Sequence, residues 1–176
     1  MSHRNGKNII RQLDSGDSKA YYEIRLAGLK LHPEAFGTGA EDWSKATDNQ
    51  IIELLEKSSR DDFVLGHFQD GKLIGVIGLK REKKHSVAHK GTVWGFFVMP
   101  DFRKRGIGEA LLKALIEKTS SHEELKHLRA VVTVTRLNVA HLFESSGFTK
   151  YGLEPRGIKE GSNFYDQSYL MLKLRD

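Results

Sequence analysis

The chain lacks cysteine altogether and has only three prolines among its 176 residues. Without thiols it forms no disulfide and no thiolate metal cluster, and no cysteine is present to carry an acyl group between two substrates. Its apolar runs fall far short of the roughly 20 residues that a membrane-spanning helix needs. Residues 1–7 are polar and lack the apolar core of a signal peptide. We therefore expect a soluble cytoplasmic protein with no membrane partner.

No internal repeat, low-complexity tract or proline-rich linker divides the sequence. The length suits one domain, because domains commonly span about 100–200 residues. A domain of about 150 residues also hides roughly 70% of the surface that its unfolded chain exposes, so a real core is expected. We interpret residues 1–176 as a single domain.

The charge is unbalanced toward the positive side. The chain has 28 Lys and Arg residues against 23 Asp and Glu residues, which gives a net charge of +5 and a pI near 9.3. Nucleic acid, an anionic membrane surface and a phosphorylated cofactor are all compatible with such a balance. Which of these partners the chain binds depends on where the Lys and Arg residues lie in the sequence and on the residues beside them.

The spacing of apolar residues predicts strands and helices in the order β-α-α-β-β-β-α-β-α-β-β. Helices are expected over 21–31, 48–57, 106–118 and 138–146, the last of them stopped by Gly147. Strands are expected over 7–13, 62–80 (a hairpin around Asp70-Gly71), 92–98, 128–135, 148–153 and 165–174. This alternation indicates a mixed sheet with helices on both faces.

The strand over 92–98 is apolar on both faces. Simple alternation places Val93 and Phe97 on one face, and Trp94, Phe96 and Val98 on the other. A strand covered on both sides is typical of the centre of a sheet.

The most informative segment follows this strand. Pro100 ends the strand, three cations stand together at 103–105, and Gly106 and Gly108 precede the most regular helical pattern of the chain. Glycines allow a ligand to approach the backbone closely, and the free N–H groups at a helix start bind phosphate. The pattern is neither a Walker A loop nor a complete dinucleotide-binding fingerprint. It is compatible with an ordinary basic turn or with a phosphate site.

Several motifs resemble those of the GCN5-related N-acetyltransferase (GNAT) family. Arg103-Lys104-Arg105-Gly106-Ile107-Gly108 matches the family signature Arg/Gln-x-x-Gly-x-Gly/Ala, and it follows a matching Val98-x-Pro100. Residues 142–148 resemble the family's Leu-Tyr-Glu-x-x-Gly-Phe, and residues 33–37 and 151–156 resemble markers of one bacterial branch. The resemblance implies an α/β (α+β) fold: a mixed, mostly antiparallel twisted sheet of about six or seven strands, helices on both faces, and a splayed strand pair that holds the cofactor.

The resemblance also implies an activity, the direct transfer of the acetyl group of acetyl-coenzyme A to a primary amine. The acceptor stays open between a small amine, an amino acid, an antibiotic and a protein N-terminus. Main-chain groups of Phe97 and Val98 would pair with the pantetheine arm and stabilise the oxyanion. The residues implied for cofactor binding are Phe97, Val98, Arg103, Lys104, Arg105, Gly106, Ile107, Gly108, Glu109, Asn138 and Phe143.

Two positions depart from the family pattern. Phe143 stands where the family usually has a tyrosine that protonates the leaving thiolate, so water, Tyr151 or Tyr165 is left for that task. Asn138 stands two residues after the position, here Arg136, where the family often has Asn. Asn138 is therefore either a cofactor contact or only the N-cap of its helix.

The general base is not defined by any motif. His89 is the candidate nearest to the central strand, and Glu34, Glu41 and His141 are further candidates. No metal is expected, because the pair His85 and His89 lacks a third ligand. Acidic residues at 34, 41 and 42 hint at a cationic acceptor.

Two other functions remain open at this point. A coenzyme A-binding regulator without catalysis would explain the phenylalanine at 143. A basic nucleic-acid-binding module is less favoured, because no aromatic residues are interleaved with the cations and no recognition helix is evident. The resemblance further implies a homodimer as one option.

Overall fold

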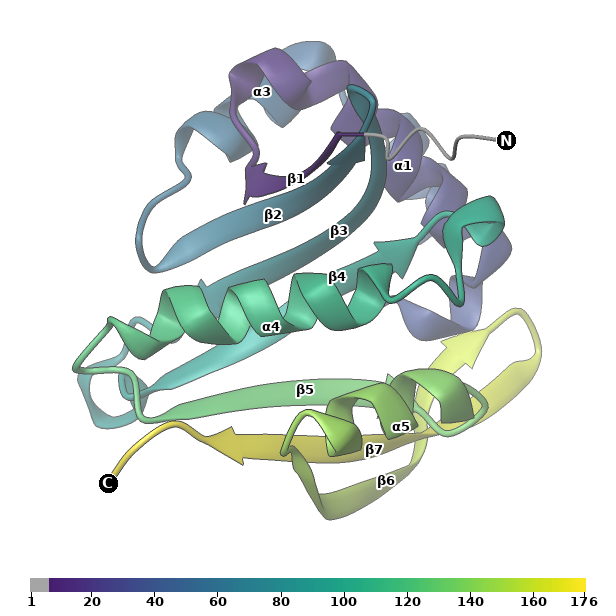
Figure 1. Ribbon diagram of the computed structural model, residues 1–176. Coiled ribbons are helices and arrows are strands. Elements are labelled where there is room, and N and C mark those ends of the chain that lie inside the picture. The colour runs from purple at the N-terminus through teal and green to yellow at the C-terminus, as the bar shows by residue number, and fades with distance from the viewer. Residues whose placement is uncertain (1–6) are drawn as a thin grey trace, which may run out of the picture.

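The computed structural model describes residues 7–176, which contain one seven-stranded sheet with helices on both of its faces (Figure 1). The strands are β1 (Asn8–Gln12), β2 (Asp62–Gln69), β3 (Lys72–Arg81), β4 (Lys90–Val98), β5 (His127–Thr133), β6 (Thr149–Glu160) and β7 (Asn163–Lys173). They lie in the order β1-β2-β3-β4-β5-β7-β6, and every neighbouring pair is antiparallel except β4 and β5.

Two hydrophobic cores lie on opposite faces of the sheet. The helices are α1 (Ser18–Leu31), α2 (Ala40–Ser44), α3 (Asp48–Glu56), α4 (Ile107–Ser120) and α5 (Leu137–Ser145). α4 and α5 cover the larger core, and α1 and α3 cover the smaller one (Figure 1). α1 approaches the sheet closely, because a Cβ at Gly28 would lie only 3.1 Å from the ring of Phe97.

The predicted order of elements and the fold class are confirmed. The short helix α2 and the full length of β6 are additions, since β6 runs to Glu160 rather than ending at residue 153. Gly147 follows α5 with a φ of +96°, as a helix-terminating glycine does. Within residues 7–176, no helix has both the length and the apolar character that a bilayer crossing requires.

The expected faces of β4 are partly wrong. Gly95 has a φ of +65°, and the register shifts so that Gly95 and Phe96 together oppose one residue of β3. This β-bulge moves the following side chains to the opposite face. Val93 and Val98 therefore belong to the core under α4, whereas Phe97 belongs to the core under α1.

β4 and β5 separate along most of their length. Only three residue pairs join them, at Lys90–Thr92 opposite His127–Arg129. Beyond Thr92 the main-chain edge of β4 that faces β5 has no strand partner among residues 7–176. The expected splayed pair is thus present, and it opens earlier than the ends of the strands.

Candidate functional site

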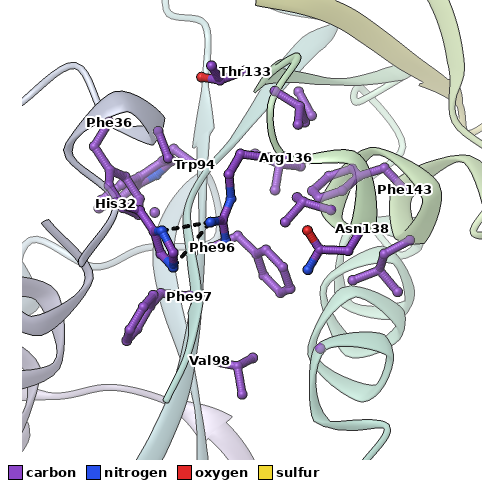
Figure 2. A pocket seen from close by; sticks show the side chains of 18 of the residues that line it. His32, Phe36, Trp94, Phe96, Phe97, Val98, Thr133, Arg136, Asn138 and Phe143 are labelled. Atoms are coloured by element: carbon purple, nitrogen blue, oxygen red, sulfur yellow. Dashed lines mark hydrogen bonds between the residues drawn. The ribbon is translucent and has the colours of Figure 1, made fainter. Parts of the chain in front are cut away.

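A cavity of about 850 Å³ occupies the separation between β4 and β5. Its walls come from β4, β5, the end of α1 with the turn that follows, and the first turns of α4 and α5. Figure 2 shows side chains from these elements meeting around the opening. This cavity therefore coincides with the only parallel pair of strands in the described sheet.

One end of the cavity is the start of α4. Lys104 and Gly106 both have left-handed backbones, with φ of +59° and +75°. No side chain caps the helix, and the first intrahelical bond shown is donated by Ala110 to Gly106. The N–H groups of residues 107–109 thus lack intrahelical acceptors, and together with the positive end of the helix dipole they suit a phosphate.

The three cations of this segment differ in where their side chains lie. Arg103 turns inward: its Nε donates to the main-chain oxygen of Val98 at 2.9 Å, and its guanidinium lies over the ring of Phe97. Lys104 lines the cavity, whereas Arg105 is exposed and lies over Phe102. The segment therefore offers its backbone and Lys104 to an anion, while Arg103 supports the end of β4.

His32, at the end of α1, joins the two separated strands. Arg103, which follows β4, lies 3.1 Å from His32 through Nη2 and Nε2, and Arg136, which follows β5, lies 2.6 Å away through Nη1 and Nδ1. Figure 2 shows Arg136 reaching across the cavity to this imidazole. The adjoining turn is also fixed to β5, because Thr133 donates its hydroxyl to the carbonyl of Glu34 at 2.8 Å.

The surroundings of His32 favour a neutral imidazole. Burial lowers its pKa below the ordinary 6.5, and the guanidinium groups of Arg136 and Arg103 lower it further, against a smaller opposite effect of Glu34. Burial and the charge of Arg136 also lower the pKa of Arg103. A neutral imidazole carries one unprotonated nitrogen, which accepts a proton or a hydrogen bond at physiological pH.

Asn138 and Phe143 both line the cavity from α5. α5 begins at Leu137 with Arg136 in the N-cap position, so the interpretation of Asn138 as an N-cap is wrong. Its amide lies in the first helical turn and points toward the cavity (Figure 2). Phe143 is 2% exposed, and its ring meets Phe96 and Phe148 edge to face.

His89 does not line the cavity. It directly precedes the three residues of β4 that pair with β5. Its carbonyl oxygen accepts hydrogen bonds from the main-chain amides of Lys126 and His127, and its ring packs on the ring of His127. The loop between β3 and β4 thus holds it away from the opening. Neither Tyr151 nor Tyr165 reaches the cavity wall.

His32 and Arg136 are the site residues that sequence reasoning missed, and Arg25 is a third side chain in the cavity wall. His32 precedes a proline and so ends a helix, which is the only local signal for its place. Arg136 offered a signal of another kind, since it replaces an expected Asn. Neither signal indicated that the two side chains meet.

The model of the Acetyltransferase (GNAT) family matches residues 26–148, and the chain belongs to this family. A curated relative, N-alpha-acetyltransferase 30 of Dictyostelium discoideum, is 31% identical over 113 residues, which are 61% of this chain and 55% of that protein. The chain therefore spans about half the length of the curated relative that it matches.

Solved structures of the same fold include a GNAT-family acetyltransferase from Streptococcus pneumoniae, with a TM-score of 0.85 and 21% identity over 95% of this chain and 99% of that one. The acetyltransferase yncA from Salmonella typhimurium, solved with its cofactor acetyl-CoA, has a TM-score of 0.84 and 21% identity over 97% and 95% of the two chains. The expected family and fold are thereby confirmed.

Proposed function

We propose that this protein is an N-acetyltransferase that moves the acetyl group of acetyl-coenzyme A directly to a primary amine. The main support for this proposal is the cavity between β4 and β5, which ends at the uncapped start of α4. A free strand edge and a helix start with free N–H groups lie along one continuous cavity. This arrangement suits a long ligand that carries amides in one part and phosphates in another.

The residues of the chain fit coenzyme A at each part of that ligand. The N–H groups of residues 107–109 and the charge of Lys104 would hold the diphosphate. The unpaired edge of β4 up to Phe97 and Val98 would bind the pantetheine amides as a neighbouring strand does. Asn138 and the ring of Phe143 would contact the same arm from α5.

When bound, acetyl-coenzyme A supplies an activated acetyl thioester. A main-chain N–H near Phe97 and Val98 would stabilise negative charge on the carbonyl oxygen in the transition state. The chain has no thiol to accept the acetyl group, so the amine would attack directly. Phe143 has no proton to donate and no tyrosine lines the cavity in the described chain, so we assign protonation of the leaving thiolate to water.

The attacking ammonium must first lose a proton. Among the described residues that line the cavity, the only imidazole is that of His32 and the only carboxylate is that of Glu109, and Glu109 lies at the start of α4 where the phosphates would bind. We therefore assign the general base to His32, in place of His89. Each ring nitrogen contacts an arginine, so one nitrogen would exchange that contact for the amine or a water and take the proton, while the other arginine orients the ring.

The test measures binding and turnover separately. Isothermal titration should show that acetyl-coenzyme A binds, and a thiol reagent should detect coenzyme A release with members of a panel of primary amines. Tight binding without turnover on any amine would favour a coenzyme A-binding regulator. Absence of binding, together with a melting shift caused by DNA, would overturn the assignment.

A further inference from the structure

Arg25 is a buried cation in the wall of the cavity. It lies on α1, two helical turns before His32, and therefore on the same face of the helix. The residue is 9% exposed, and its Nη1 lies next to the bulge of β4, since a Cβ at Gly95 would be 3.6 Å away. Arg25 thus reaches the cavity from the α1 face of the sheet, on which His32 also lies.

No anion in the described chain neutralises this guanidinium. No carboxylate of residues 7–176 forms an ion pair with Arg25, and its Nε and Nη1 are buried without a hydrogen-bond partner. Burial lowers the pKa of Arg25, although an arginine stays charged at neutral pH. A buried charge without a partner is costly, which indicates that something else binds it.

Aromatic rings surround the cation. The guanidinium carbon lies 4.7 Å from the ring centre of Phe36, 5.8 Å from that of Trp94 and 5.9 Å from that of Trp43. These rings hold the guanidinium in place by cation–π contact. They supply neither an acceptor for its N–H groups nor a second cation. The pocket around Arg25 thus offers one positive charge within apolar walls.

The net charge of the cavity wall is positive, which favours an anionic group on the acceptor over the cationic acceptor expected from the sequence. Glu41 and Asp42 do not line the cavity, and Glu41 pairs with Lys45 at 3.0 Å. Glu34 stands behind the wall, where its carboxylate lies 4.0 Å from Arg136 and 3.8 Å from His32. Among residues 7–176, the formally charged side chains of the wall are Arg25, Arg103, Lys104 and Arg136, with Glu109 as the single acid.

Building on the proposed acetyltransferase function, we infer that the acceptor is a small amine that also carries a carboxylate, as amino acids do, and that Arg25 binds this carboxylate. A guanidinium forms charge-assisted hydrogen bonds with a carboxylate, and Nη2 is the nitrogen of Arg25 that the protein does not enclose. A phosphate monoester has a larger charge and more acceptor oxygens than one guanidinium among three rings satisfies. The burial of Arg25 favours a small molecule over the surface of a protein.

The binding experiment uses matched amines that differ only in the carboxylate: L-leucine with 3-methylbutylamine, L-phenylalanine with 2-phenylethylamine, and 6-aminohexanoate with pentylamine. Trp43 and Trp94 are the two tryptophans of the chain and both lie beside Arg25, so intrinsic fluorescence reports on this pocket without turnover. Titrations are made with coenzyme A present. Arg25→Met removes the charge and replaces the side chain by an unbranched apolar one of similar length. Lys30→Met, the control, removes one exposed charge from the same helix.

At least one carboxylated member should give a saturable fluorescence change at roughly 10- to 100-fold lower concentration than its partner without the carboxylate. Arg25→Met should abolish this difference without lowering the melting temperature, because it removes an unpaired buried charge, and Lys30→Met should keep it. Arg25→Lys should retain part of the difference.

Three results would overturn the inference: equal responses within every pair, no saturable response to any carboxylate, or a difference that survives Arg25→Met. Failure of the proposed function itself has another signature, which is loss of acetyl-coenzyme A binding in the calorimeter. An enzyme that binds acetyl-coenzyme A and acetylates both members of each pair equally would retain the function and lose only the role of Arg25.

Discussion

His32 lies between two guanidinium groups that come from segments 33 residues apart in the sequence. Burial and those two charges keep the imidazole neutral by disfavouring its protonated form, so one ring nitrogen retains its lone pair near pH 7. Replacing it by glutamine keeps a polar side chain of similar reach and removes the titratable group.

We expect His32→Gln to lower kcat by roughly 100-fold, a loss typical of a general base, with little change in the KM of acetyl-coenzyme A. In the native enzyme the rate should fall as the pH drops through the lowered pKa of His32, below 6.5, and His32 should add no further change above that pH. The variant should lack this acidic limb. Steady-state rates from pH 5 to 8 check the prediction, and His89→Gln, which alters a residue outside the cavity, serves as the control.

At position 106, glycine is favoured by the backbone conformation alone and not by a lack of space for a side chain. Its φ is +75°, and an added Cβ would meet nothing within 4 Å. Gly106→Ala should therefore destabilise the protein by about 1 kcal/mol through backbone strain. Gly37→Ala is the matched control, because that glycine has the same open space without a positive φ and should leave stability nearly unchanged. Urea denaturation of both variants measures the difference, and equal midpoints would contradict it.

The start of α4 is held by its neighbours as well as by its own sequence. A Cβ at Gly108 would lie 2.9 Å from Cζ of Phe96 on β4 and 3.3 Å from a methyl of Leu142 on α5. Gly108 is thus a packing position between three elements. A larger residue there disturbs the fold itself in addition to any ligand.

We expect Gly108→Ala to cost about 1–3 kcal/mol of stability, as overpacking does. The double variant Gly108→Ala with Phe96→Leu should recover part of this loss, because the smaller side chain makes room. Denaturation curves of the two single variants and the double variant give the coupling energy. If the stability changes of the two single variants simply add in the double variant, the contact with Phe96 is not what restricts the side chain at position 108.

At the scale of the whole molecule, the cavity is the place where the sheet lacks strand pairing, so a ligand there should stabilise the fold by mass action. At a concentration 100 times its Kd, a ligand adds about 2.7 kcal/mol. For a domain of this size each kcal/mol raises Tm by roughly 2–4 °C. Acetyl-coenzyme A should thus raise Tm by about 5–10 °C, whereas duplex DNA at equal phosphate concentration should not. The reverse order would support the nucleic-acid alternative.

Three buried or partly buried histidines make stability depend on pH. Burial lowers the pKa of His67, and burial with nearby positive charges lowers those of His32 and His127. Below pH 6.5 the unfolded chain takes up these protons before the folded chain does, so stability is complete above pH 6.5 and falls as the pH drops through the lowered values. Urea midpoints at pH 7.5, 6.5 and 5.5 should show this order. A midpoint that rises toward pH 5.5 would contradict it.

Sequence reasoning reached the features that depend on neighbours along the chain. The helix after Gly106, the hairpin at Asp70-Gly71 and the phosphate-type helix start follow from local spacing and backbone chemistry. The splayed strands followed from the family resemblance. The faces of β4 were assigned incorrectly because strict alternation was carried through Gly95, although a glycine inside a strand pattern is a signal of a β-bulge.

The sequence alone therefore determined the elements, the family and one end of the cavity, because those are written in local periodicity and in a contiguous motif. Only the tertiary structure decided which distant side chains meet. His32 contacts Arg136 across 104 residues, His89 is held outside the cavity, and Arg25 is buried without an anion. Charge, burial and distance between such groups arise when α1 packs on β4, and they distinguish a residue that can accept a proton from one that merely has the right chemistry.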